Sequence, residues 1–229
     1  MDFTWLPKFA PLLLSGLWMT VLLLILSCFF GIILAVPIGL VQVTGPKWLA
    51  SLAKAFCTVI RGTPLLIQLY LLYYGLGTLF PSIPWLRHSF LWPVLREGFF
   101  YAVLAFTLSF AGYEGAIMRG AFASVPKGEL EAARAYGMSP FTLLRRIWLP
   151  RAVRLVLPTL GGEVILQLKA TPIAALVTVN ELYGAAGQVF RTTYDFFPPM
   201  LLVAVVYFAL TFIITRLFNM VERMVPQRR

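Results

Sequence analysis

The residues that could take part in chemistry are polar and charged side chains inside long apolar stretches. Glu163 follows Gly161-Gly162, and Glu114 and Gln68 lie in two other apolar stretches. An ionisable group at membrane depth is costly, and it usually faces the interior of a helix bundle or an aqueous cavity. We therefore predict that Glu163, Glu114 and Gln68 lie on the path of a polar solute, with Glu163 placed to bind a cationic group.

Each acid also has a structural interpretation. Glu163 could pair with Lys169 or with a basic residue of a second subunit, and the sequence leaves this alternative open. For Glu114, an ion pair with Arg119 is favoured over a place in a cavity. Pro158 and Gly161-Gly162 predict an irregular helix near Glu163. Exposed backbone groups are tolerated in a membrane only beside a cavity or under protein, so such a helix would lie in one of these two places.

The sequence lacks the usual signatures of an enzyme. It has one histidine, His88, and two cysteines, Cys28 and Cys57, without the spacing of metal ligands. It has no Gly-Lys dipeptide, so it cannot form a Walker A phosphate-binding loop. There is no Ser/His pair and no acid–His metal motif. We expect no catalytic residue, no metal ion and no cofactor in this chain.

The loop over 124–149 is predicted to form two short helices joined by a tight turn. The first helix is expected over 128–136, and Gly137 then supplies the residue after the C-cap, which often needs a positive φ. Ser139 is suited to cap the second helix, and Pro140 to be its first residue. The two helices would form a compact knob at the membrane surface.

This loop carries a spaced pattern that resembles the EAA signature of binding-protein-dependent ABC importer permeases. The pattern is Glu131-Ala132-Ala133, three residues, Gly137, nine residues, Ile147, one residue, and Leu149-Pro150. In that family the loop is the coupling helix, which docks into a groove of a cytosolic ATPase. The resemblance implies that this chain contacts such an ATPase through Glu131, Ala132, Ala133 and Gly137.

A second resemblance narrows the family. The run 61–66, Arg-Gly-Thr-Pro-Leu-Leu, and the run 124–128 resemble segments of the polar amino acid permeases, whose substrates include histidine, glutamine, arginine and opines. The family implies a homologous or identical second permease subunit, two cytosolic ATP-binding subunits and an extracytoplasmic amino-acid-binding protein. It also implies the inner membrane of a bacterial cell. Gly162 stands where the family usually has Asn, and Glu114 lies two positions before the family's acid, so the particular substrate stays open.

Composition and hydrophobic runs predict an all-α membrane protein. The 229 residues are 60% hydrophobic and 12% charged, whereas a soluble domain has about 45–50% apolar and about 25% charged residues. A spanning helix needs about 20 mostly apolar residues. Five spans are expected in a single permease domain over 1–229, and they cover about 12–41, 50–80, 98–118, 150–179 and 199–218. Arg61 is expected to anchor a helix break inside the second span.

The distribution of basic residues predicts the orientation. The net charge is +10, and its clustering between apolar runs indicates contact with a lipid bilayer and not with nucleic acid. With the N-terminus outside, 13 Lys and Arg lie in inner segments and 4 in outer ones. The positive-inside rule therefore predicts an outer N-terminus, a cytosolic C-terminus and a cytosolic coupling loop. An ion-coupled secondary amino acid transporter is the alternative, although it gives no reason for the spaced loop.

Overall fold

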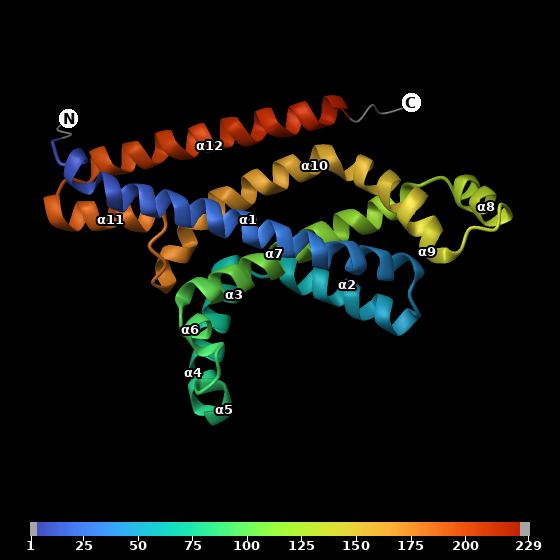
Figure 1. Ribbon diagram of the computed structural model, residues 1–229, viewed down its shortest axis with the longest axis horizontal. Helices are drawn as coiled ribbons and strands as arrows, with labels where there is room; N and C mark the ends of the chain where they lie inside the picture. The colour runs from blue at the N-terminus through green and yellow to red at the C-terminus, as the bar shows by residue number, and fades with distance from the viewer. Residues whose placement is uncertain (1–3, 225–229) are drawn as a thin grey trace.

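The computed structural model describes residues 4–224, which form a bundle of long helices without a strand in that range (Figure 1). Five helical stretches in it are long and apolar enough to cross a membrane, and they are Leu6–Thr44, Leu65–Ser82, Gly98–Ser124, Pro140–Val177 and Phe197–Met224. The predicted fold class is therefore confirmed. The orientation stays a prediction, and two of the inner cations counted for it, Arg228 and Arg229, lie outside the described residues.

The centre of the bundle is the pair α1 (Leu6–Thr44) and α7 (Gly98–Ser124). A side chain added at Gly31 would meet Phe110, and one added at Gly39 would meet Met118, so both contacts join residues 79 positions apart. This constant offset means that the two helices run parallel and in register. Small residues at every fourth position of α1 allow this close approach.

Enlarging Gly39 is expected to destabilise the bundle. An added Cβ at this position would lie 2.6 Å from the Met118 Cβ, so Gly39→Leu should cost about 1–3 kcal/mol through overpacking. Thermal unfolding in detergent, followed by size-exclusion chromatography, measures the effect. Gly120→Leu is the matched control, because an added Cβ there has nothing within 4 Å. Equal stability of both variants would contradict the packing of α1 on α7.

The second expected span, 50–80, contains a break that separates two helices. α2 (Lys47–Gly62) ends before Thr63, and α3 (Leu65–Tyr70) continues through a π-helical turn, η1 (Leu71–Leu76), into α4 (Gly77–Leu79) and the 3₁₀ turn η2 (Phe80–Ser82). Pro64 has no N–H and disfavours helical backbone at Thr63, which is extended with φ −118°. Ile60 of α2 packs on Gly112 of α7, and the chain leaves the direction of the bundle after α3 (Figure 1). Leu65–Ser82 is therefore long and apolar enough to span, but only its first part lies along the bundle, as a continuation of α2.

The fourth expected span is regular where an irregular helix was predicted. α10 (Leu149–Ala170) continues through Pro158 and both glycines, so the predicted irregularity near Glu163 is wrong. Pro158 removes only one N–H group, and Gly161 lets the Phe218 ring pack directly on the helix. The irregular turns lie at the two ends of α10, as the π turn η3 (Leu144–Trp148) and the 3₁₀ turn η4 (Thr171–Val177).

At the end of the bundle where the chain begins, α11 (Leu182–Thr193) packs on α1, and α12 (Phe197–Met224) packs on α11 and α10 (Figure 1). The buried Glu181 carboxylate caps α11 by accepting hydrogen bonds from the Tyr183 and Gly184 N–H groups, at 3.0 and 2.7 Å. It also accepts one from the Tyr207 hydroxyl of α12, at 3.1 Å. Burial raises the pKa of Glu181, and these hydrogen bonds oppose the rise. This polar network joins α11 to α12.

Candidate functional site

The predicted knob lies at the other end of the molecule, beyond the ends of α7 and α10 (Figure 1). It consists of α8 (Lys127–Ala135) and α9 (Pro140–Leu143). Gly137 has φ +76°, and the Gly137 and Met138 N–H groups bond the carbonyls of Arg134 and Ala133, which is a Schellman motif. The Ser139 hydroxyl caps α9 by accepting from the Thr142 N–H at 3.3 Å. The local predictions for this loop are confirmed.

The knob is held rigidly on the bundle. Trp148, at the start of α10, donates from its indole N–H to the Phe122 carbonyl of α7 at 2.9 Å, and the two rings pack edge to face. The Arg151 guanidinium of α10 lies 3.0 Å from the Glu129 carboxylate of α8. Leu130 is buried in the same cluster. A force applied to α8 would therefore reach α10 directly.

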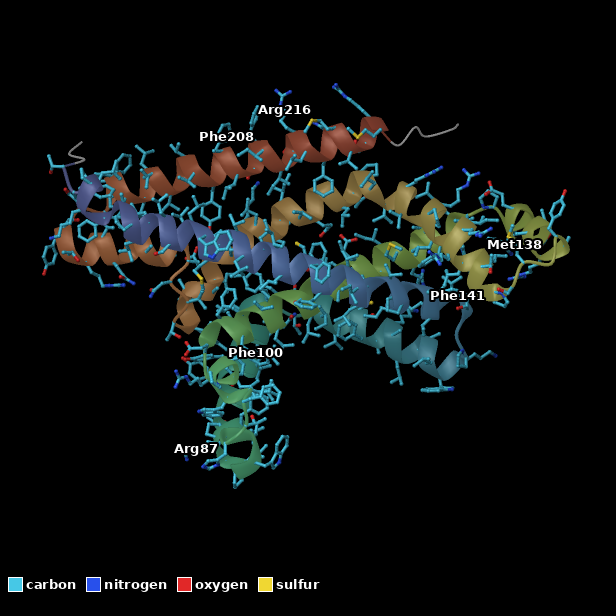
Figure 2. All side chains as sticks on the ribbon, in the orientation of Figure 1. Arg87, Phe100, Met138, Phe141, Phe208 and Arg216 are labelled. Atoms are coloured by element: carbon cyan, nitrogen blue, oxygen red, sulfur yellow. The ribbon has the colours of Figure 1, made fainter. Side chains whose placement is uncertain are left out.

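The residues predicted to contact an ATPase lie on different sides of the knob. Glu131, Ala132 and Gly137 are exposed, whereas Ala133 is 4% exposed. Ala132 and Ala133 line one groove, and Glu131 lines another. Sequence reasoning missed two exposed aromatic residues on this surface, Tyr136 at 88% and Phe141, whose position Figure 2 shows. Its place directly before Gly137, at the turn that ends the helix, is the sequence feature that could have indicated that Tyr136 is exposed on the knob.

A cavity of about 200 Å³ lies between α3, α7 and α10. Its lining combines polar and apolar residues, and these are Leu65, Ser109, Phe110, Tyr113, Glu163, Leu166, Gln167 and Ala170. Sites for small molecules usually measure about 300–1,000 Å³. The cavity in one chain is smaller than this range, and it is open on one side.

Glu163 is the acid in this cavity. It is half-buried, and the ion pairs within residues 4–224 are Arg96–Glu97 and Arg151–Glu129, so Glu163 does not pair with Lys169. Six residues of helix separate these two side chains and place them on different faces. The alternative of a basic partner on a second subunit stays open. The structure places Glu163 where a solute in the cavity would reach it.

Glu114 is covered on all sides. It is 1% exposed, and the buried Oε1 of its carboxyl has no hydrogen-bond partner. It forms no ion pair with Arg119 within the part of the chain that the structure describes, so the favoured pairing is wrong. Five residues of helix turn Arg119 outward while Glu114 points into the bundle. Glu114 does not line the cavity, but its carboxyl is within electrostatic range of Glu163.

Arg61, which was expected to anchor the helix break, also contacts a residue of the cavity lining. Its guanidinium lies 5.7 Å from the centre of the Tyr113 ring, within the range of a cation–π contact. It is also within electrostatic range of the Glu163 carboxyl. The cavity wall therefore combines an acid with a nearby cation.

Gln68 has a structural position and is not part of the cavity lining. Its Nε2 donates to the Ile60 carbonyl at 2.8 Å and to the carbonyl and hydroxyl of Thr63 at 3.1 and 2.8 Å. It thus caps the end of α2 across the Pro64 break, and its place on the solute path stays a prediction. The cavity instead contains Gln167, which sequence reasoning missed. Gln167 follows Glu163 by one helical turn, and this spacing could have indicated that the two side chains share one face of the helix.

Removing the amide of Gln68 is expected to destabilise the chain without a specific loss of transport. Gln68→Leu leaves the Ile60 and Thr63 carbonyls without this donor, which should cost about 1–3 kcal/mol. Thermal unfolding in detergent and uptake per folded molecule are the two measurements. Ile67→Leu, at the exposed neighbouring position, is the control. Lost uptake at unchanged stability would instead support the predicted place of Gln68 on the solute path.

A bundle with five candidate spans, an embedded polar cavity and a knob at one end is the architecture of a multi-pass membrane subunit. The family model described as "Binding-protein-dependent transport system inner membrane component" matches residues 27–226, and the chain belongs to this family. The predicted family and the inner-membrane location are confirmed. Neither the family nor the relatives favour the ion-coupled alternative.

Two relatives and two solved structures illustrate the similarity. The octopine transport system permease protein of Rhizobium radiobacter is 40% identical over 218 residues, which cover 95% of this chain and 87% of the relative. The histidine/lysine/arginine/ornithine transport system permease protein of Escherichia coli K12 is 38% identical over 209 residues, which cover 91% and 87%. The crystal structure of an amino acid ABC transporter with histidines has a TM-score of 0.81 at 32% identity and covers 98% of this chain and 99% of that chain. The inward-facing MetNI methionine ABC transporter, at TM-score 0.78 and 20% identity, covers 99% and 100% and shows the shared fold.

Proposed function

We propose that this chain forms half of the translocation pathway of an ATP-driven importer for amino acids or opines that carry a cationic group. The observation that carries this proposal is Glu163, an acid in the membrane cavity without an ion-pair partner in residues 4–224. A carboxylate in such surroundings favours a cation. The names of the relatives, for octopine and for histidine, lysine, arginine and ornithine, support the same substrate class.

The complete transporter would contain several other subunits. A second permease subunit, homologous or identical, would close the open side of the small cavity. Two cytosolic ATP-binding subunits would bind the knobs and hydrolyse ATP, so this chain itself would not be an enzyme. An extracytoplasmic amino-acid-binding protein would deliver the substrate. The family description, which names a binding-protein-dependent transport system, supports the last of these partners.

The mechanism is alternating access driven from the knob. Closure of the ATP-binding subunits would move α8, whose Glu129 is paired with Arg151 at the start of α10. Glu163 lies on the same helix, 12 residues and about 18 Å further along. Because α10 continues unbroken between these positions, tilting it at the knob would move Glu163 relative to α3 and α7. The cavity would then change the side to which it opens.

ATP-dependent uptake by the reconstituted transporter tests this function. We expect radiolabelled arginine and histidine to accumulate in vesicles only when ATP is supplied to the ATP-binding subunits, and glutamine to accumulate more slowly. A cysteine at Ala132 should crosslink to the ATP-binding subunit. Uptake driven by an ion gradient without that subunit would overturn the proposal.

A further inference from the structure

An arm projects sideways from the bundle, across the direction of α1 (Figure 1). It covers residues 71–97 and consists of η1, α4, η2, α5 (Pro84–Arg87) and α6 (Trp92–Leu95). It joins α3 to the start of α7. Neither the knob nor the membrane cavity uses a residue of the arm, so its purpose is separate from the features described above.

The attachment point sets the depth of the arm in the membrane. α7 has 27 residues and is about 40 Å long, which matches the full thickness of a bilayer with its headgroups, about 40–45 Å. The knob follows the last residue of α7 and lies in water. Gly98, the first residue of α7, therefore lies at the headgroup level of the opposite leaflet. The arm is attached there and runs along the membrane plane.

The surface of the arm is apolar and uncovered. Trp85 is 72% exposed and Phe90 is 89% exposed, and further exposed apolar side chains are Leu79, Leu91 and Val94. Tryptophan concentrates at membrane interfaces, where its ring contacts the acyl chains and its N–H contacts water. Phenylalanine adds apolar area on the acyl side. In-plane segments of this kind bury their apolar side chains at the boundary of headgroups and acyl chains.

The charge of the arm is complementary to an anionic headgroup. Glu97 is the only acid between residues 71 and 97, and its carboxylate lies 3.3 Å from Arg96. Arg87 has no such counter-charge within the described chain. Figure 2 shows Arg87 at the far part of the arm, on the side that faces away from α2. With the apolar side chains of the arm facing into the bilayer, the side that carries Arg87 faces out of it.

We propose that residues 80–96 form an in-plane anchor in the leaflet opposite the knob, with Trp85 and Phe90 inserted at the acyl boundary and Arg87 bound to the phosphate of an anionic phospholipid. The anchor holds the joined ends of α3 and α7 at a constant depth while the knob end moves. The partner is lipid and not protein, because the exposed surface combines apolar bulk with an unpaired cation at headgroup depth.

The depth of a spin label on the arm tests the insertion. Phe90→Cys, in the full chain with Cys28 and Cys57 replaced by alanine, is labelled with a nitroxide in the assembled transporter and reconstituted in phosphatidylcholine vesicles with phosphatidylglycerol. We expect greater accessibility to oxygen than to a water-soluble nickel chelate. Tyr194→Cys, between α11 and α12 and away from the knob, is the control and should show the reverse, since this side chain is 85% exposed. A label at residue 90 that behaves like the label at residue 194 would overturn the anchor.

A charge reversal tests the headgroup contact. Arg87→Glu should move the label at residue 90 toward water in vesicles with phosphatidylglycerol and leave its depth unchanged in phosphatidylcholine alone. Arg191→Glu, at an exposed position of α11, is the control and should change neither. The same depth in both lipids for Arg87→Glu would overturn the phosphate contact. Protection of residue 90 only after the binding protein is added would overturn the lipid as partner.

Discussion

Replacing Gly137 by valine is expected to lower ATP-driven uptake about 5–30-fold while ATP hydrolysis continues. Gly137 has φ +76° and ends α8 in a Schellman motif. A β-branched residue in this left-handed conformation costs about 1–2 kcal/mol. The strain is relieved when the last turn of α8 unwinds, and the knob then loses its rigid connection to α10. Parallel measurement of uptake and ATP hydrolysis in proteoliposomes gives the ratio that defines coupling.

Two further substitutions separate backbone strain from a simple change of surface. Gly128→Val lies in the same helix without a positive φ and with nothing within 4 Å of an added Cβ, so it should keep the coupling ratio. Gly137→Asn should recover most of the uptake, because asparagine tolerates the left-handed region better than valine. Normal coupling in Gly137→Val would contradict the role of the knob.

Replacing Glu163 by glutamine is expected to lower the uptake of arginine about 10–150-fold. The substitution keeps the size of the side chain but removes the negative charge. The proposed hydrogen bond to the cationic group of the solute would then lose its charge assistance, and such a bond is worth about 1.5–3 kcal/mol. Uptake at a range of arginine concentrations measures the loss, and transport of glutamine should fall much less. Glu163→Asp should retain part of the arginine uptake because the charge remains.

The same variants decide between solute binding and a structural ion pair. Lys169→Gln is the control on the same helix, and it should transport normally because Lys169 is exposed and does not pair with Glu163. If Glu163 instead pairs with a basic residue of the second subunit, Glu163→Gln should dissociate the complex in size-exclusion chromatography. Intact assembly with unchanged arginine uptake would contradict both interpretations.

The sequence predicted the knob better than it predicted the polar cluster. The end of α8 and the cap of α9 follow from Gly137, Ser139 and Pro140, which act through their own backbone conformation and their nearest neighbours. The capping role of Gln68 was not predicted because its acceptors lie across a helix break. The burial of Glu114 was not predicted because α1 and α10 pack on α7, and a single helix does not reveal which face its neighbours cover.

What the sequence by itself determined is therefore the class of protein, the five spans and the shape of the knob, because hydropathy, chain length and caps act within a few residues along the chain. Only the tertiary structure decided which acid faces the cavity and which is enclosed. It also decided that α10 is continuous and that the arm lies across the bundle. These features depend on contacts between distant segments, such as Gly161 with Phe218 and Phe122 with Trp148, whose pairing is set by close packing in three dimensions.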